Sequence, residues 1–158
     1  LHFYPVCNPT GYEDDTRTAR TGRDLNQEFW RESDQPEVRF LESEIWMQGF
    51  HGIVSLHSDP DSSGIYGFVQ GDILSESLLE PALQSASVHV PRNHHPVIHG
   101  LPARHGIIRH GYPGILQSVP GMKHPPFELT IESPRQALIE AQALALASAV
   151  GRVLAGDP

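Results

Sequence analysis

The apolar residues of this chain fall into short runs that are separated by polar stretches rich in glycine and proline. Residues 52–57 are apolar and β-branched in the manner of a buried strand, and residues 127–131 form a second such run. Shorter runs at residues 1–7 and 66–69 predict two more strands.

Apolar residues at helical spacing predict a helix over residues 36–48. Val38, Leu41 and Ile45 recur every three or four residues and would share one face. Gly49 follows directly and is a typical helix terminator.

Two further helices are predicted later in the chain. One covers residues 73–86, with Pro81 as a break or kink. The other runs from Pro134 to about Gly156, with Ser133 as its cap. The apolar stripe predicted for this last helix comprises Leu138, Ala141, Ala145, Ala149 and Val153.

The alternation of strands with helices predicts the fold class. We expect an α/β fold with a mixed, largely parallel sheet flanked by helices. Residues 88–126 hold seven of the ten histidines and many prolines, and they predict short strands and loops around a cleft.

Composition narrows the class of protein. A length of 158 residues suits one domain, and 39% hydrophobic with 19% charged residues is typical of a globular chain. The net charge of −8 argues against a nucleic-acid partner, and no apolar run in the sequence reaches the length of a membrane span. The single cysteine, Cys7, is predicted to be buried; it excludes an internal disulfide and leaves the compartment open.

Several short motifs follow one another at defined spacing. The segment Asn8-Pro-Thr-Gly is followed by Arg17 and then by Asp24-Leu-Asn-Gln, with fourteen residues between Gly11 and Asn26. His57 lies thirty-one residues beyond Asn26, at the end of the buried strand at residues 52–57. Glu132 lies at the end of the last predicted strand.

In this order and spacing, the motifs resemble the zinc carboxypeptidase family. That family includes metallocarboxypeptidases, murein-peptide amidases and, more distantly, aspartoacylase and succinylglutamate desuccinylase. The resemblance implies a zinc-exopeptidase-like fold in which residues 1–158 form a single domain, equivalent to the C-terminal two thirds of the family domain. The family's first zinc motif, His-x-x-Glu, occurs nowhere in the sequence, so we expect the N-terminal strands that carry it to be missing.

The resemblance assigns chemistry to three residues. His57 would be one ligand of a single catalytic zinc ion, since imidazole is a common zinc ligand. Glu132 would be the general base that takes a proton from zinc-polarised water, and Arg17 would stabilise the oxyanion. From the residues alone, each of the three could instead be an ordinary strand-end or surface residue, and with one of three expected ligands we expect zinc binding to be weak or absent.

Three more residues would contact the substrate. Asn26 matches the family's Asp-x-Asn-Arg motif, but Gln27 stands where the arginine is expected and lacks the charge that pairs with a terminal carboxylate. Arg20, Arg23 or Arg109 could supply that charge instead. Tyr112 precedes Glu132 by twenty residues, as does a mobile tyrosine in many carboxypeptidases.

The resemblance therefore predicts a zinc-dependent hydrolase that cuts an amide bond in a peptide or an amino-acid derivative. An N-acyl amino acid deacylase and a truncated, non-catalytic binding module are the alternatives. We expect a peptide or acylated amino acid as the partner, with no nucleic acid and no membrane. Self-association through exposed sheet edges would follow if the N-terminal strands are absent.

Overall fold

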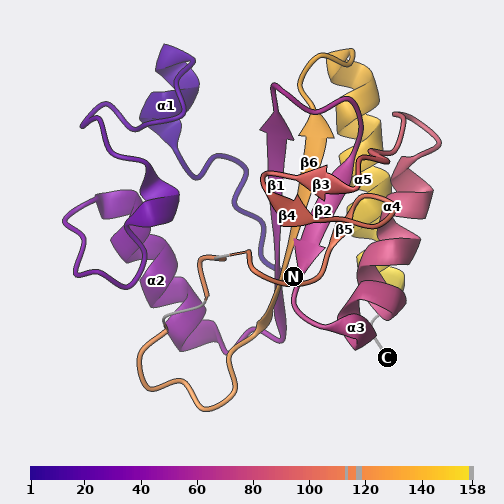
Figure 1. The fold of residues 1–158 in the computed structure, drawn as a ribbon. Coiled ribbons are helices and arrows are strands. Elements are labelled where there is room, and N and C mark those ends of the chain that lie inside the picture. The colour runs from indigo at the N-terminus through magenta and orange to yellow at the C-terminus, as the bar shows by residue number, and fades with distance from the viewer. Residues whose placement is uncertain (113, 117–118, 157–158) are drawn as a thin grey trace. The chain divides into compact units, whose positions relative to one another are not determined.

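A computed structural model describes residues 1–112, 114–116 and 119–156. The chain divides into two compact units (Figure 1). The prediction of a single domain stays a prediction. The first unit comprises Leu1–His51 with Gly114–Pro126, and the second comprises Gly52–Pro113 with Phe127–Pro158.

The second unit is built on a four-stranded sheet in the order β1-β6-β2-β5. Strand β1 (Gly52–Asp59) runs parallel to β6 (Phe127–Pro134), and β2 (Tyr66–Val69) runs parallel to β5 (Ile107–Ile108). The two pairs meet where β2 runs antiparallel to β6. The predicted mixed, largely parallel sheet is confirmed, and β1 and β6 both extend beyond their predicted ends.

Helices cover one face of this sheet (Figure 1). A short helix, α3 (Asp72–Leu74), continues through a π-helical turn (Ser75–Leu79) into α4 (Glu80–Ala86). The predicted break at Pro81 is wrong, because the wider turn precedes the proline and leaves it in the first turn of α4, where its missing N–H is tolerated. The alternative, a kink at Pro81, stays a prediction.

Helix α5 (Ile139–Gly156) begins later than predicted. Ser133 and Pro134 end strand β6, and the buried Ser133 hydroxyl bonds to the carbonyl of His57 on β1, so these residues belong to the sheet. Of the predicted stripe, Ala145, Ala149 and Val153 are buried in the core, whereas Leu138 precedes the helix and is 77% exposed.

By length and composition α5 could cross a membrane, and 22% of it is buried in the structure. The expected absence of a membrane partner stays a prediction. The buried residues of α5 pack with Leu79 and Leu83 from the α3–α4 segment and with Leu129 from β6, as in a core helix of a globular domain.

A two-stranded hairpin packs on the other face of the sheet. Strands β3 (Val97–Ile98) and β4 (Leu101–Pro102) are joined by a two-residue turn in which His99 and Gly100 have φ of 51° and 76°. Ile98 and Leu101 pack in a second cluster of buried residues, Tyr66, Phe68 and Ile108.

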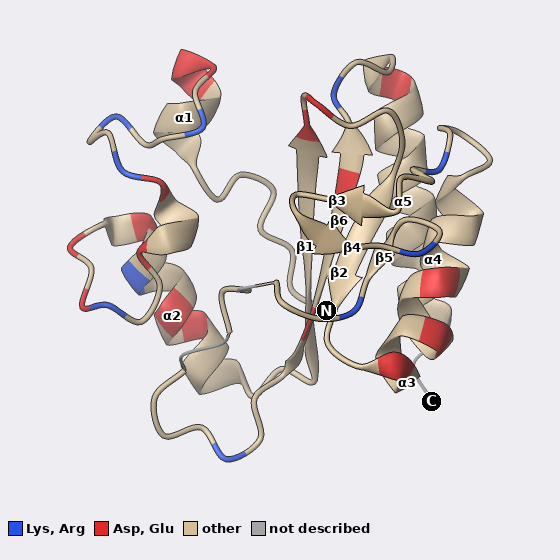
Figure 2. Ribbon diagram, viewed as in Figure 1, with Lys and Arg blue, Asp and Glu red and all other residues tan. Residues whose placement is uncertain are grey.

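The first unit contains α1 (Pro9–Asp14), a short 3₁₀ helix η1 (Leu25–Gln27) and α2 (Pro36–Gln48). The predicted helix over residues 36–48 is confirmed, and Gly49 ends it in the left-handed conformation. Acidic and basic residues are interspersed over this unit (Figure 2).

The predicted strand at residues 1–7 is wrong. This segment has no strand conformation, and Leu1 and Phe3 are 96% and 77% exposed. Pro5 lacks a backbone donor and does not favour strand pairing. Cys7 is exposed rather than buried.

Two glycines permit close contacts in the second unit. Gly52 and Phe127 are the first pair of the β1–β6 ladder, and a Cβ on Gly52 would lie 2.1 Å from the Phe127 ring. A Cβ on Gly64 would lie 2.6–2.7 Å from backbone atoms of residues 91–93. These residues exchange backbone hydrogen bonds with Ile65, which directly precedes β2.

Gly64→Ala should destabilise the protein by about 1–3 kcal/mol, because the backbone of residues 91–93 would have to move. The matched change Gly151→Ala, in open space on α5, should stabilise it by about 0.5–1 kcal/mol. Urea unfolding of both variants gives the comparison. Equal stability of Gly64→Ala and the wild type would contradict the close approach.

Candidate active site

His57 and Glu132 lie directly opposite each other on neighbouring parallel strands. Glu132 is also the register partner of Tyr66 on β2. Paired residues on adjacent strands project from the same face of a sheet, so the three side chains form one row. The row lies at the carboxyl ends of β1 and β6, where ligands bind in open α/β sheets.

Asp59 extends this row by one step on β1. It lies two residues after His57 and therefore projects from the same face. Asp59 is the last residue of the strand and is buried. The backbone N–H of Asp61 donates to Oδ1 at 2.8 Å, and the Tyr66 hydroxyl donates to Oδ2 at 2.7 Å.

The hairpin turn brings a third polar side chain to this pair. His99 Nε2 lies 2.7 Å from the Tyr66 hydroxyl and 3.2 Å from Asp59 Oδ2. Neither His99 nor Asp59 was predicted as a site residue. The two-residue period of a strand could have placed Asp59 on the same face as His57. His99 comes from a hairpin that no pattern in the sequence placed on this face.

Burial and hydrogen bonding act in opposite directions on the Asp59 carboxyl. Burial raises its pKa, but the hydrogen bonds from Tyr66 and the Asp61 N–H and the nearby His99 outweigh burial and hold the pKa below its usual value. Burial raises the pKa of Tyr66, and the hydrogen bond to Asp59 and the charge of Glu132 add to the rise. The phenol therefore stays protonated at neutral pH.

Tyr112 lies on the same face as Glu132. Its ring stacks on Phe68, with centroids 3.8 Å apart, and Phe68 is two residues beyond Tyr66 on β2. The Tyr112 side chain is half-buried, and its carbonyl accepts a hydrogen bond from Gln70. Its predicted contact with substrate stays a prediction.

The other predicted residues belong to the first unit, where Asp24 holds them together. Arg17 Nε donates to Asp24 Oδ2 at 3.0 Å, although the Arg17 side chain is 74% exposed. The Asp24 side chain and carbonyl accept the backbone N–H groups of Asn26 and Gln27. Asp24 therefore positions the start of the 3₁₀ helix and the guanidinium at once.

The segment Asn8-Pro-Thr-Gly begins helix α1 rather than forming a free turn. The Asn8 side chain accepts the Gly11 N–H at 3.0 Å as a helix cap and donates to the carbonyl of Arg17 at 3.2 Å. This motif thus supports the backbone of Arg17.

The three arginines considered as substitutes for the missing charge all pair with carboxylates. Arg20 binds Asp14 and Glu13, and Arg23 binds Glu28 and Asp34. Arg109 binds Asp72 at 2.9 Å. Each would have to give up such a pair to bind a substrate.

The residues described do not form a metal site by themselves. Within residues 1–112, 114–116 and 119–156, no group of three His, Cys, Asp or Glu side chains could hold a metal ion. His57 is the only ligand that the resemblance assigns to this chain, so further ligands would have to come from outside the described residues.

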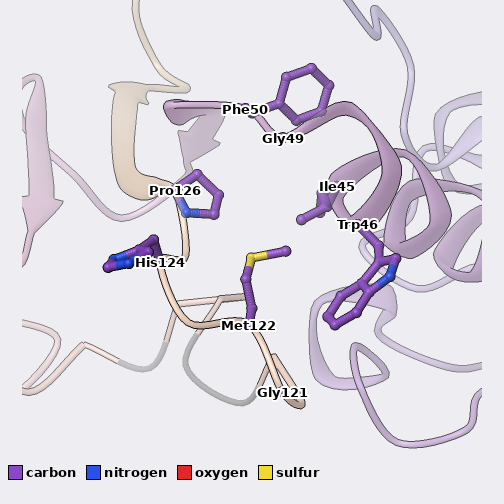
Figure 3. A pocket seen from close by; sticks show the side chains of 8 residues that line it. All are labelled: Ile45, Trp46, Gly49, Phe50, Gly121, Met122, His124 and Pro126. Atoms are coloured by element: carbon purple, nitrogen blue, oxygen red, sulfur yellow. The ribbon is translucent and has the colours of Figure 1, made fainter.

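A shallow apolar pocket of about 420 Å³ lies in the first unit (Figure 3). Ile45, Trp46 and Phe50 line it together with Met122, His124 and Pro126. None of the predicted site residues lines this pocket.

No protein-family profile and no curated protein matches this sequence. Among solved structures, the chain is similar to a protein from Shewanella denitrificans provisionally described as a metallopeptidase, with a TM-score of 0.77 and 18% identity over 96% of this chain and 59% of that one. A protein from Shewanella amazonensis with the same description gives a TM-score of 0.76 and 21% identity over 95% and 61% of the two chains.

A metallo-carboxypeptidase from Burkholderia cenocepacia is similar at a TM-score of 0.63, with 20% identity over 96% of this chain and 43% of that one. The chain therefore has the carboxypeptidase-like fold that the motifs predicted. It spans less than two thirds of the length of these solved chains.

The lowered pKa of Asp59 predicts how stability depends on pH. The stabilisation is present above the unfolded pKa of about 3.9 and is lost as the pH falls through the lower folded value. Tyr66→Phe should cost about 1–3 kcal/mol at pH 7 and less at low pH, where protonation weakens the same contact in the wild type. Urea unfolding from about pH 6 to about pH 2.5 measures this, and a cost of Tyr66→Phe that does not change with pH would contradict it.

Proposed function

We propose that this chain carries the general base of an amide hydrolase that acts on a peptide or an amino-acid derivative. The observation that supports this is the position of Glu132 opposite His57, at the carboxyl ends of two adjacent parallel strands. The motif order and the similarity of fold to metallopeptidases agree with it.

Glu132 has the surroundings that a base requires. It is half-buried near the carboxyl end of an eight-residue strand whose neighbours on both sides fix its backbone. A carboxylate held on a rigid strand can take a proton from water and pass it to a leaving amine. Arg17, oriented by Asp24, has the permanent charge and directed donors that suit an oxyanion.

A divalent metal, which the family resemblance makes zinc, belongs to this proposal as a property of the complete protein. The described residues do not supply a ligand set. The reading frame ahead of Leu1 provides the direct test: a His-x-x-Glu motif there would supply the other ligands, and a start codon there would favour a non-catalytic binding module.

The substrate end recognised by this chain differs from a plain carboxylate. Gln27 offers hydrogen-bond donors without charge, and Arg20 and Arg23 are paired with carboxylates of the same unit. This observation favours an amidase for substrates with a neutral end over an N-acyl amino acid deacylase, whose substrate keeps a free carboxylate.

Glu132→Gln should lower kcat by about 10²–10⁴-fold with little change in KM, because the amide cannot accept the proton. The assay is hydrolysis by the zinc-loaded protein expressed from its complete gene, with panels of dipeptides and N-acyl amino acids. Glu140→Gln, an exposed change on α5, is the matched control and should keep full activity. Full activity of Glu132→Gln would remove the base from the proposal.

Gln27→Arg should shift selectivity toward substrates with a free carboxylate, since a guanidinium restores a bidentate ion pair. We expect kcat/KM for such dipeptides to rise by about tenfold relative to their amidated counterparts, the equivalent of one charged hydrogen bond. Gln48→Arg, an exposed change in the same unit, adds the same charge elsewhere and controls for charge alone. An unchanged ratio would exclude Gln27 from the substrate end.

A further inference from the structure

Two histidines, His94 and His105, lie together on the surface of the second unit. Their rings meet edge to face at an angle of 88°, with ring centres 5.9 Å apart. Both residues are exposed. Within the described part of the chain, neither ring makes a hydrogen bond, so their nitrogens are open to a ligand from solvent.

The backbone at His94 is fixed by the buried residue before it. Asn93 donates its backbone N–H to the carbonyl of Ile65 at 2.9 Å, and its side chain donates to Ser62 Oγ at 3.0 Å. The same side chain accepts the backbone N–H of His95 at 2.9 Å. His94 is therefore held between two anchored residues.

His105 lies in a tight turn of its own. The first and last residues of this turn, Arg104 and Ile107, exchange both backbone hydrogen bonds at 3.0 Å. His105 and Gly106 have φ of 50° and 75°, as the two central residues of a type I′ turn require.

This turn packs directly on the backbone that carries His94. Arg92 Nε donates to the carbonyl of His105. A Cβ on Gly106 would lie 3.0 Å from the carbonyl oxygen of Asn93. The two histidines thus come from contacting backbone segments, which fix the separation of their rings to within side-chain rotation.

That separation suits a shared metal ion. Zinc lies about 2.1 Å from an imidazole nitrogen and so about 3.2 Å from the centre of the ring. Two rings that share one ion therefore have centres at most roughly 6.4 Å apart, and about 5.2 Å apart at a tetrahedral angle. The observed 5.9 Å lies inside this limit, and small rotations of two exposed side chains reach the tetrahedral value.

We propose that His94 and His105 form a two-histidine site for a divalent zinc-like ion. Imidazole is a ligand that zinc and its neighbouring transition metals share. The described residues supply no third ligand, so water would complete the coordination. The pair contains none of the residues of the proposed hydrolase, and the inference goes beyond that function.

An ion at this site would join the two ends of the segment at residues 95–104. This segment contains the β3–β4 hairpin, whose turn brings His99 to Asp59 and Tyr66. An ion that binds only when both ends are in place stabilises that arrangement by mass action. The site therefore acts as a clasp on the hairpin beside the candidate active site.

Titration of the metal-free chain with zinc chloride at pH 7.5 tests the site, with the imidazole resonances of all ten histidines followed by ¹H–¹⁵N spectroscopy. We expect the resonances of His94 and His105 to move first and together, with a stoichiometry of one ion. His94→Gln and His105→Gln should each weaken binding by about 10²-fold, because one ligand alone lacks the chelate effect. The double variant should bind no more weakly than either single variant.

His110→Gln is the matched control, since it removes another exposed histidine of the same unit and should leave the affinity unchanged. In the wild type, zinc should also slow amide hydrogen exchange of residues 97–102, and it should not do so in His105→Gln. Far-ultraviolet circular dichroism establishes that each variant is folded.

Equal zinc affinity of the wild type and both single variants would overturn the inference, and so would shifts spread evenly over the exposed histidines. Zinc that moves the His57 resonance and leaves the pair unmoved would overturn it while leaving the proposed function intact. None of these measurements requires amide hydrolysis, so a protein without activity would refute the proposed function and not this site.

Discussion

The parallel pairing of β1 with β6 is the constraint on which the candidate site depends. Eight consecutive residue pairs fix the two strands, and the sixth of these pairs is His57 with Glu132. Helices α4 and α5 bury the opposite face of β6, so the strand that carries Glu132 also belongs to the main core. A change that loosens this ladder would therefore affect stability and the site together.

The first unit shows a second way of holding functional residues, without a sheet. Asn8 caps α1 and binds the carbonyl of Arg17, while Asp24 binds the Arg17 guanidinium and the start of the 3₁₀ helix. The separate motifs of the sequence thus support one another through side-chain hydrogen bonds to backbone. Because short polar side chains must reach defined backbone groups, their spacing along the chain is restricted.

The sequence predicts the parts of this structure that depend on local pattern. The strands at residues 52–57 and 127–131 and the helix at residues 36–48 follow from apolar periodicity, and the structure confirms them. Residues 1–7 have an apolar pattern but no strand partner among the described residues of their unit, so propensity alone misleads there. The sequence at Ser133 and Pro134 fits a helix start as well as it fits a strand end. Only the hydrogen bond from the Ser133 hydroxyl to β1 decides between the two. His99 reaches the site through a hairpin of two-residue strands, which is too short to give a periodic signal.

The contact between Gly52 and the Phe127 ring has a consequence for how the chain finds its native alignment. The ring fills the space where a side chain on residue 52 would lie, so β1 and β6 match at their first step only when glycine faces phenylalanine. A slip of one residue would bring Ile53 against the ring and would turn every later side chain of β1 to the other face. The absence of a side chain at residue 52 thus fixes the register of β1 against β6. This register in turn places the imidazole of His57, five residues further along β1, opposite the carboxylate of Glu132.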